Sequence, residues 1–171
     1  RGLGDVYKRQ EVTVALLEEL TIEAIVISPG PGKPSDYPIL KSVLDRYASS
    51  VPILGICLGF QLIYEYYGGE IIHGPKPVHG HTTPIIHTGK GLFKHLPQNF
   101  NVMRYHSLIA NRQQLPSQLN TTATNNEGIM MAFEHDTLPI FAVQYHPESI
   151  LSEYGHQQIQ YLSLIHISEP T

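Results

Sequence analysis

The feature that most constrains the fold of this chain is a cysteine that stands between two glycines at the end of an apolar run. Residues 52–56 are apolar throughout, which is typical of a strand buried on both faces. Cys57 follows directly, and an apolar helical pattern then extends over residues 58–67. The sequence Gly55-Ile56-Cys57-Leu58-Gly59 at such a junction has the form of a nucleophile elbow, with a thiol in place of the usual hydroxyl. We therefore predict that Cys57 is a nucleophile.

The same junction predicts the state of the sulfur. The first N–H groups of the following helix, and the positive end of its dipole, would point at Cys57 and favour the thiolate. The alternative is a buried structural role, because Cys57 is the single cysteine of the chain and has no disulfide partner within it. The two flanking glycines, which remove steric conflict in a tight turn, favour the nucleophile.

The first half of the chain alternates between strand-like and helix-like patterns. Residues 24–27 form another continuous apolar run, expected to be a strand buried on both faces, and residues 39–47 have helical spacing. The segment Ser28-Pro29-Gly30-Pro31-Gly32 separates them as a shaped loop. A short capped helix is also expected at residues 13–20. Alternating strands and helices imply an open parallel α/β sheet.

The second half is rich in short β-like runs that are separated by turn residues. We expect these runs to be antiparallel strands that extend the sheet, followed by a last helix at about residues 153–161. The runs are residues 82–87, 100–105, 119–124, 129–133 and 140–145. The expected fold class is therefore α/β, with an open, mostly parallel sheet flanked by helices and an antiparallel extension.

A cysteine nucleophile needs a base, and the base needs an acid that orients it. Among ten histidines, His146 stands out because His146-Pro147-Glu148 closes the apolar run 141–143. Sites of α/β proteins assemble at the carboxyl ends of parallel strands. Pro147 turns the chain, so that Glu148 can fold back toward the imidazole. A surface histidine at the end of a strand is the alternative interpretation.

Other classes of function are disfavoured by composition and spacing. Four further histidines fit no standard metal-ligand pattern, and few carboxylates lie near them in sequence, so no metal is expected. They are His73, His79, His81 and His87. A net charge of −4 and the lack of a basic tract argue against nucleic acid as a partner. No apolar run approaches the roughly 18 residues of a membrane span, so no membrane partner is expected.

The two ends of the chain are related to each other through DNA. The first ten residues, RGLGDVYKRQ, can be encoded by CGTGGGCTCGGAGATGTGTATAAGAGACAG. The reverse complement of that DNA encodes LSLIHISEPT, the last ten residues. The DNA also resembles a transposon-based sequencing-library adaptor. We therefore expect residues 1–10 and 162–171 to be translated adaptor, and residues 11–161 to be a fragment of a natural domain.

Three segments, in their order and spacing, resemble the class I (triad-type) glutamine amidotransferase family. They are Ser28-Pro29-Gly30-Pro31-Gly32, Gly55-Ile56-Cys57-Leu58-Gly59-Phe60-Gln61 and His146-Pro147-Glu148-Ser149. The resemblance spans nearly all of residues 11–161. Residues 104–108 and 146–152 are most similar to the glutaminase subunits of anthranilate synthase and aminodeoxychorismate synthase. Residues 151–157 favour the aminodeoxychorismate branch, or a subunit shared by both.

The resemblance implies a glutaminase subunit that hydrolyses glutamine and delivers ammonia to a chorismate-utilising synthase subunit. Cys57 would be the nucleophile, His146 the general base and then acid, and Glu148 the residue that orients His146. The resemblance also implies an oxyanion hole made by Gly30, Gly32 and Leu58. The amino-acid end of glutamine would be held by Gln61, Ser107 and Leu108. No cofactor is implied, and the expected location is cytoplasmic.

The chain departs from the family pattern in three respects. Phe60 stands where a histidine is common and His81 where a lysine is common, which we expect to alter partner contact or substrate fit. The βα unit with which the family fold starts is missing, so we expect an N-terminally truncated domain. The rim that meets the partner is predicted at Tyr64, Tyr67 and residues 75–81.

Two other functions remain open at this point. One is another enzyme with the same triad, such as the amidotransferase domain of guanylate synthesis or a γ-glutamyl hydrolase, which residues 104–108 and the small size disfavour. The other is a non-catalytic binding or regulatory relative. The presence of Cys57, His146 and Glu148 together argues against it.

Overall fold

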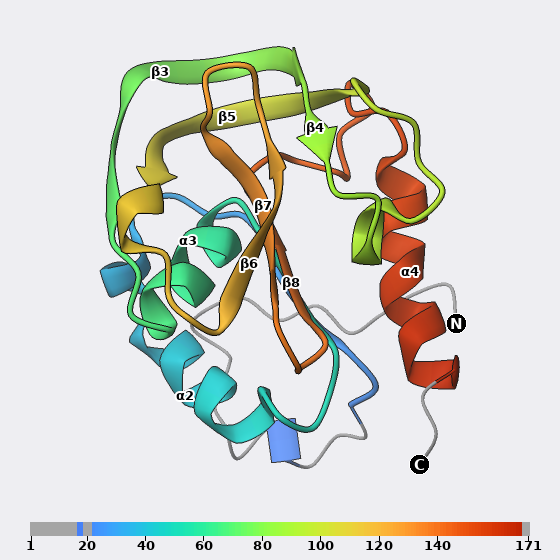
Figure 1. The fold of residues 1–171 in the computed structure, drawn as a ribbon. Coiled ribbons are helices and arrows are strands. Elements are labelled where there is room, and N and C mark those ends of the chain that lie inside the picture. Colours follow the sequence, from blue (N-terminus) through green and yellow to red (C-terminus); the bar gives the residue numbers. More distant parts are fainter. Residues whose placement is uncertain (1–16, 19–21, 169–171) are drawn as a thin grey trace.

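The centre of the molecule is a six-stranded mixed sheet (Figure 1). In the computed structural model, which describes residues 17–18 and 22–168 and side chains up to residue 165, its strand order is β1-β2-β8-β7-β6-β4. The strands are β1 (Ile25–Ile27), β2 (Ile53–Ile56), β4 (Ile86–His87), β6 (Leu119–Thr124), β7 (Met130–His135) and β8 (Ile140–Val143). β1, β2 and β8 are parallel, and β8, β7, β6 and β4 pair antiparallel. The α/β class and the antiparallel extension are confirmed, in a sheet that is mixed rather than mostly parallel.

Helices cover both faces of this sheet (Figure 1). α2 (Pro38–Tyr47) and α3 (Leu58–Tyr66) pack on one face, where Leu44, Ile63 and Tyr64 are buried against strand residues. α4 (Gly155–Ser168) and the 3₁₀ turn Gly91–Phe93 pack on the other. Both helices predicted at residues 39–47 and 58–67 are therefore present. The helix expected at residues 13–20 lies outside the described residues except for 17–18, which are helical.

Burial along the parallel strands follows their position in the sheet. All residues of β2 and β8 are buried, as a strand with neighbours on both sides requires. Among the described residues, β1 ends the strand order and has a neighbour on one side only. Ile27 is buried, but Val26 is 47% exposed, so the prediction that residues 24–27 are buried on both faces is wrong. The apolar run predicts a strand correctly, whereas burial of its second face needs a covering element.

A second sheet of two antiparallel strands stands beside the first (Figure 1). It pairs β3 (Ile71–Pro84) with β5 (Asn101–Ala110), with register shifts after residues 73 and 79. The prediction that residues 82–87 and 100–105 extend the main sheet is therefore wrong, except for the two residues of β4. Residues 71–81 contain two prolines and two glycines, which disfavour a regular strand in sequence. Irregular pairing accommodates them in the structure.

The last helix is longer than its sequence pattern predicts. It extends to Ser168 rather than ending near residue 161. Leu162 and Ile165 lie one helical turn apart and are both buried, in the cluster that contains Phe93 and Phe141. Helical spacing of apolar residues is sufficient for this packing. The origin of residues 162–171 in adaptor DNA stays a prediction.

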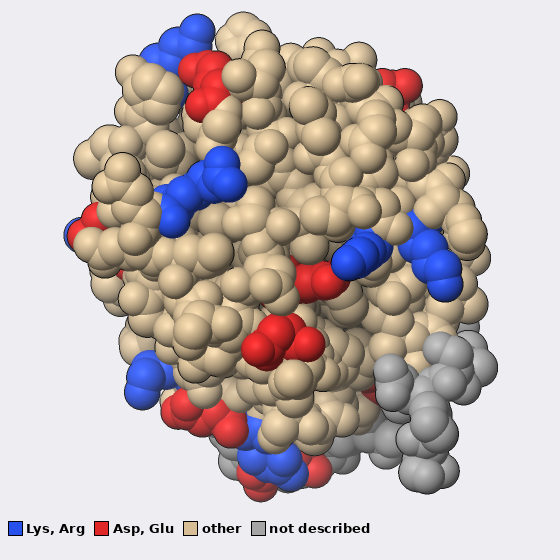
Figure 2. Space-filling model, in the orientation of Figure 1, with Lys and Arg blue, Asp and Glu red and all other residues tan. Residues whose placement is uncertain are grey.

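Basic side chains do not gather on the face of the molecule that Figure 2 shows. On the face in Figure 2, lysine and arginine side chains are scattered singly or in pairs, several of them beside acidic ones. Within the described part of the chain, no helix has the length and apolarity to cross a membrane.

Candidate active site

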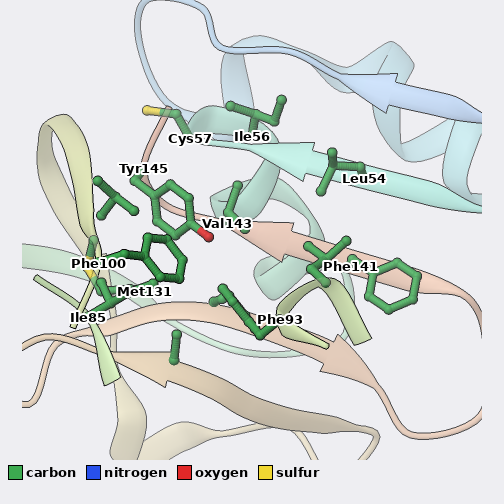
Figure 3. Packing of buried hydrophobic residues seen from close by; sticks show 14 of the residues in the cluster. Leu54, Ile56, Cys57, Ile85, Phe93, Phe100, Met131, Phe141, Val143 and Tyr145 are labelled. Carbon is green, nitrogen blue, oxygen red and sulfur yellow. The ribbon is translucent and has the colours of Figure 1, made fainter. Parts of the chain in front are cut away.

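The elbow predicted at Cys57 is present between β2 and α3. Cys57 has φ of 54° and ψ of −99°, a left-handed conformation that is uncommon for any residue other than glycine. A Cβ atom at Gly59 would lie 2.3 Å from the carbonyl oxygen of Ile27, and one at Gly55 would lie 2.7 Å from the carbonyl carbon of Gly59. Both glycines are needed because α3 crosses the strands too closely for a side chain. Figure 3 shows Cys57 at the carboxyl end of β2, above Tyr145.

The sulfur of Cys57 is buried and surrounded by hydrogen-bonding groups. The thiol donates to the carbonyl oxygen of Tyr105 at 3.6 Å. The Leu58 backbone N–H and the Gln144 amide, at 3.7 Å, donate to the sulfur. Burial raises the pKa of the Cys57 thiol to about 11, although the Leu58 and Gln144 donors lower it, and the negative charge of Glu148 raises it further. The expectation that the helix terminus makes the thiolate the favoured form is therefore wrong, because desolvation outweighs it.

His146 and Glu148 form a hydrogen-bonded pair just after β8. The Nδ1 atom of His146 lies 2.9 Å from Oε2 of Glu148, so Glu148 does fold back around Pro147 as predicted. The other ring nitrogen, Nε2, is buried and has no hydrogen-bond partner among the described residues. With the proton on Nδ1 and donated to the carboxylate, Nε2 carries the lone pair of a neutral imidazole. The pair therefore presents an oriented base.

One edge of β5 holds both the Cys57 thiol and the backbone of His146. The carbonyl of Tyr105 accepts a hydrogen bond from the Cys57 thiol. The carbonyl of Met103 accepts one of 2.9 Å from the backbone N–H of His146. Residues two apart in a strand direct their carbonyls to the same side, about 7 Å from each other. Cys57 and His146 are thus neighbours along this edge, although 89 residues separate them in sequence.

A cavity of about 210 Å³ opens beside Cys57. Its lining includes every residue that the resemblance assigns to the oxyanion hole and to glutamine binding. These residues are Gly30, Gly32, Leu58, Gln61, Ser107 and Leu108. The loop 28–32 is held near the elbow by Tyr37, whose hydroxyl donates to the Pro31 carbonyl at 2.5 Å. His146 and Glu148 are not among the residues that line this cavity.

Two buried residues of the site were not singled out from the sequence. Gln144 is fully buried and contacts both Cys57 and Gln61. His106 is buried too: its Nδ1 donates to the Leu108 carbonyl at 2.9 Å, and its Nε2 accepts from Arg104. Burial first, and the nearby charge of Arg104, lower the pKa of His106 to about 4. A polar residue that directly follows a fully apolar strand was the one sequence feature that pointed to Gln144.

The structure corrects several expectations about the periphery of the site. Tyr64 is completely buried and donates to the Asn111 carbonyl at 2.7 Å, so its assignment to the partner rim is wrong. Phe60 is completely buried against Tyr64 and Phe133, so it belongs to the core and cannot contact a partner. The exposed part of the cavity lining includes His79 and Tyr105, whose rings are 5.2 Å apart.

The histidines considered as metal ligands do not assemble. Within the described residues, no three histidine, cysteine, aspartate or glutamate side chains come together in a way that suits a metal ion. His87 instead stacks on Phe93 and bonds to the Pro97 carbonyl at 2.8 Å. His87 thus has a packing role in the core.

Comparison with known proteins identifies the family that the sequence and the fold resemble. The sequence matches the family Glutamine amidotransferase class-I over residues 5–164. It is 41% identical over 157 residues to a multifunctional tryptophan biosynthesis protein of Pichia angusta, covering 91% of this chain and 43% of that protein. It is 38% identical over 155 residues to the aminodeoxychorismate/anthranilate synthase component 2 of Bacillus subtilis, covering 91% of this chain and 80% of that protein. The structure resembles that of a Thermoplasma acidophilum protein described as a GMP synthase component, with a TM-score of 0.80, 26% identity, and coverage of 90% and 76%.

The fold is of the α/β class, and Cys57 stands at a tight strand-to-helix junction beside a cavity. The chain belongs to the class I glutamine amidotransferase family. It spans less than half the length of the multifunctional relative, and about four fifths of the component 2 relative.

Proposed function

We propose that this chain is the glutaminase part of a chorismate-utilising synthase, which hydrolyses glutamine and passes ammonia to a synthase partner. The observation that carries the proposal is the 2.9 Å contact between His146 Nδ1 and Glu148 Oε2. It leaves Nε2 buried and without a partner among the described residues, and the backbone of His146 lies on the same β5 edge as the Cys57 thiol. The names of the relatives, one of them an aminodeoxychorismate/anthranilate synthase component 2, support the chorismate branch.

In the first half-reaction the Cys57 sulfur attacks the side-chain amide carbon of glutamine. Because the pKa of the thiol is about 11, the sulfur must lose its proton as it attacks, and His146 Nε2 accepts that proton. Glu148 stabilises the imidazolium that results. The amide oxygen becomes an oxyanion, which the backbone N–H groups of Gly30, Gly32 and Leu58 hold. Each such donor contributes about 3 kcal/mol to the transition state.

In the second half-reaction the base acts as an acid. His146 returns the proton to the amide nitrogen, the carbon–nitrogen bond breaks and ammonia leaves. A glutamyl thioester on Cys57 remains. Water, deprotonated by His146, attacks the thioester, and glutamate departs with regeneration of the thiol. The complete reaction consumes one glutamine and one water and produces one glutamate and one ammonia.

The cavity supports this choice of substrate. Its volume of about 210 Å³ suits a small amino acid, and Cys57 lies in its wall beside Gln61 and Leu108. Ser107 and the exposed backbone of this wall provide polar contacts for the amino and carboxylate groups of glutamine. The side-chain amide would then extend toward the sulfur.

The product explains why a partner is needed. Ammonia becomes ammonium in neutral water and loses its nucleophilicity, so it must reach a second active site without entering solvent. The exposed His79 and Tyr105 at the cavity lining replace Tyr64 as our candidates for the rim that the partner covers. Docking there would also hold the loop 28–32 in its productive geometry, because a small difference in free energy suffices to shift a loop between two arrangements.

Glutamate release tests the proposal directly. It is measured at saturating glutamine, for the chain alone and with a chorismate-utilising synthase subunit plus chorismate. We expect slow release alone, a substantial increase with the partner, and none from Cys57→Ala in either condition. An electrophilic glutamine analogue should bind covalently to the native chain and raise its mass by that of one bound analogue, and it should leave the mass of Cys57→Ala unchanged. Activity that survives in Cys57→Ala would contradict the assignment of the nucleophile, and an equal rate with and without the partner would contradict the coupling.

A further inference from the structure

Gln144 is a buried polar residue that the steps above do not use. It follows β8 directly, is completely buried, and its backbone N–H donates to the Met131 carbonyl at 2.9 Å. A buried amide must satisfy both its oxygen and its nitrogen, because leaving either unpaired costs about 1–3 kcal/mol. The hydrogen-bond partners of the Gln144 side chain therefore indicate how its amide is oriented.

The hydrogen bonds around Gln144 determine which end of its amide faces the nucleophile. The Leu108 carbonyl can only accept, so the Gln61 atom 3.4 Å from it must be the nitrogen Nε2. That nitrogen can only donate, so the Gln144 atom 3.3 Å from it must be the oxygen Oε1. The remaining Gln144 atom, Nε2, then lies 3.7 Å from Sγ of Cys57. The Leu108 carbonyl thus orients the Gln61 amide, and Gln61 in turn orients the Gln144 amide so that its N–H points at the sulfur.

We propose that Gln144 is a further catalytic residue of this site, whose side-chain amide donates a hydrogen bond to the Cys57 sulfur and stabilises its thiolate during attack. Gln61 is a positioning residue for it, because Gln61 holds the Gln144 oxygen. The inference rests on the proposed function for its place in the reaction, since glutamine hydrolysis is where the thiolate is needed.

The surroundings of the sulfur explain why such a donor is required. Burial is the largest influence on the Cys57 pKa and raises it to about 11, and the Glu148 carboxylate acts in the same direction. Two donors oppose them, the Leu58 backbone N–H and the Gln144 amide. During attack the Leu58 N–H is also required by the oxyanion. Gln144, which does not line the cavity, is free of that second task.

The single cysteine makes the proposal measurable without glutamine. Iodoacetamide alkylates thiolates, and Cys57 is the only thiol in the chain, so the rate of alkylation against pH reports the titration of this sulfur. Gln144→Met keeps the side-chain volume and lacks the donor. We expect it to raise the midpoint of this profile by about one pH unit, so that alkylation at any pH below the midpoint is about tenfold slower than in the native chain. Gln113→Met, at an exposed glutamine away from the site, is the matched control and should keep the native midpoint.

A double-mutant cycle tests the role of Gln61. Gln61→Met should raise the midpoint by less than Gln144→Met, and the double variant should equal Gln144→Met alone, because Gln61 acts on the sulfur only through Gln144. If Gln144→Met does not fold, Gln144→Asn carries the same test, because an amide shorter by one methylene does not reach the sulfur. A folded Gln144 variant with the native alkylation midpoint would overturn the proposal. Since no glutamine is used, this result is independent of whether the native chain releases glutamate.

Discussion

The hydroxyl of Ser152 donates a hydrogen bond of 2.6 Å to the backbone carbonyl of His146 and accepts one of 2.9 Å from the N–H of Met103. The Met103 carbonyl in turn accepts the N–H of His146 at 2.9 Å. The three residues close a ring that joins the turn carrying His146 to the edge of β5. The position of the proposed base therefore depends on one hydroxyl group six residues further along the chain.

Removal of that hydroxyl should misplace the imidazole without removing it. We expect Ser152→Ala to lower kcat for glutamine hydrolysis about tenfold, which corresponds to one hydrogen bond, with little change in KM. Ser152→Thr keeps the hydroxyl and should recover most of the activity. Ser50→Ala, which removes a hydroxyl bonded to the Tyr47 carbonyl far from the triad, serves as control. Full activity in a folded Ser152→Ala protein would show that the ring does not position His146.

The contact between α3 and β1 predicts a large loss of stability for Gly59→Ala. The added Cβ would meet the Ile27 carbonyl oxygen at 2.3 Å, so backbone must move. We expect the free energy of unfolding to fall by about 3 kcal/mol, measured by urea denaturation. Gly68→Ala, at the end of the same helix, meets nothing within 4 Å and suffers only from its φ of +99°. Its loss should be about 1 kcal/mol, and equal losses in the two variants would refute the steric explanation.

His106 should make the stability of the fold sensitive to acid. Burial lowers the pKa of His106 from 6.5 to about 4 in the folded state. Between these two pH values the unfolded chain therefore binds a proton at this histidine, and the folded chain does not. The stabilisation is therefore complete above pH 6.5 and is lost as the pH falls toward 4, by up to about 3 kcal/mol. Urea denaturation of native and His106→Asn proteins at pH 7.5, 5.5 and 4.5 measures it. A pH dependence that is the same in both would exclude His106 as the cause.

Tyr145 connects the end of β8 to α4 through a buried hydrogen bond. Its hydroxyl donates to Oε1 of Gln158, and both side chains are almost completely buried. Tyr145→Phe leaves that oxygen without its donor, and we expect a loss of about 1–3 kcal/mol in the free energy of unfolding. Adding Gln158→Leu should return part of that loss, because the stranded oxygen is then removed. If the second change only adds to the first, the hydrogen bond is not the source of the loss.

The elbow and the turn at His146 were predictable because each is made by residues close together in sequence. Gly55, Cys57 and Gly59 define a tight turn within five positions, and Pro147 brings Glu148 back to His146 within three. The helices and parallel strands follow from the spacing of apolar residues in the same local way. Residues 71–81 were not predictable as a strand, because their prolines and glycines conceal a pairing that depends on β5.

The sequence by itself therefore determined the α/β class, and it singled out the residues that we propose as nucleophile, base and orienting acid. Only the tertiary structure decided how they meet and in what state. The Cys57 thiol is bonded to a carbonyl 48 residues away and to an amide 87 residues away. Its raised pKa comes from burial, which is a property of the whole packed core. Hydrogen bonds across such separations and the removal of water have no counterpart in local spacing, because both depend on which distant segments the sheet places side by side.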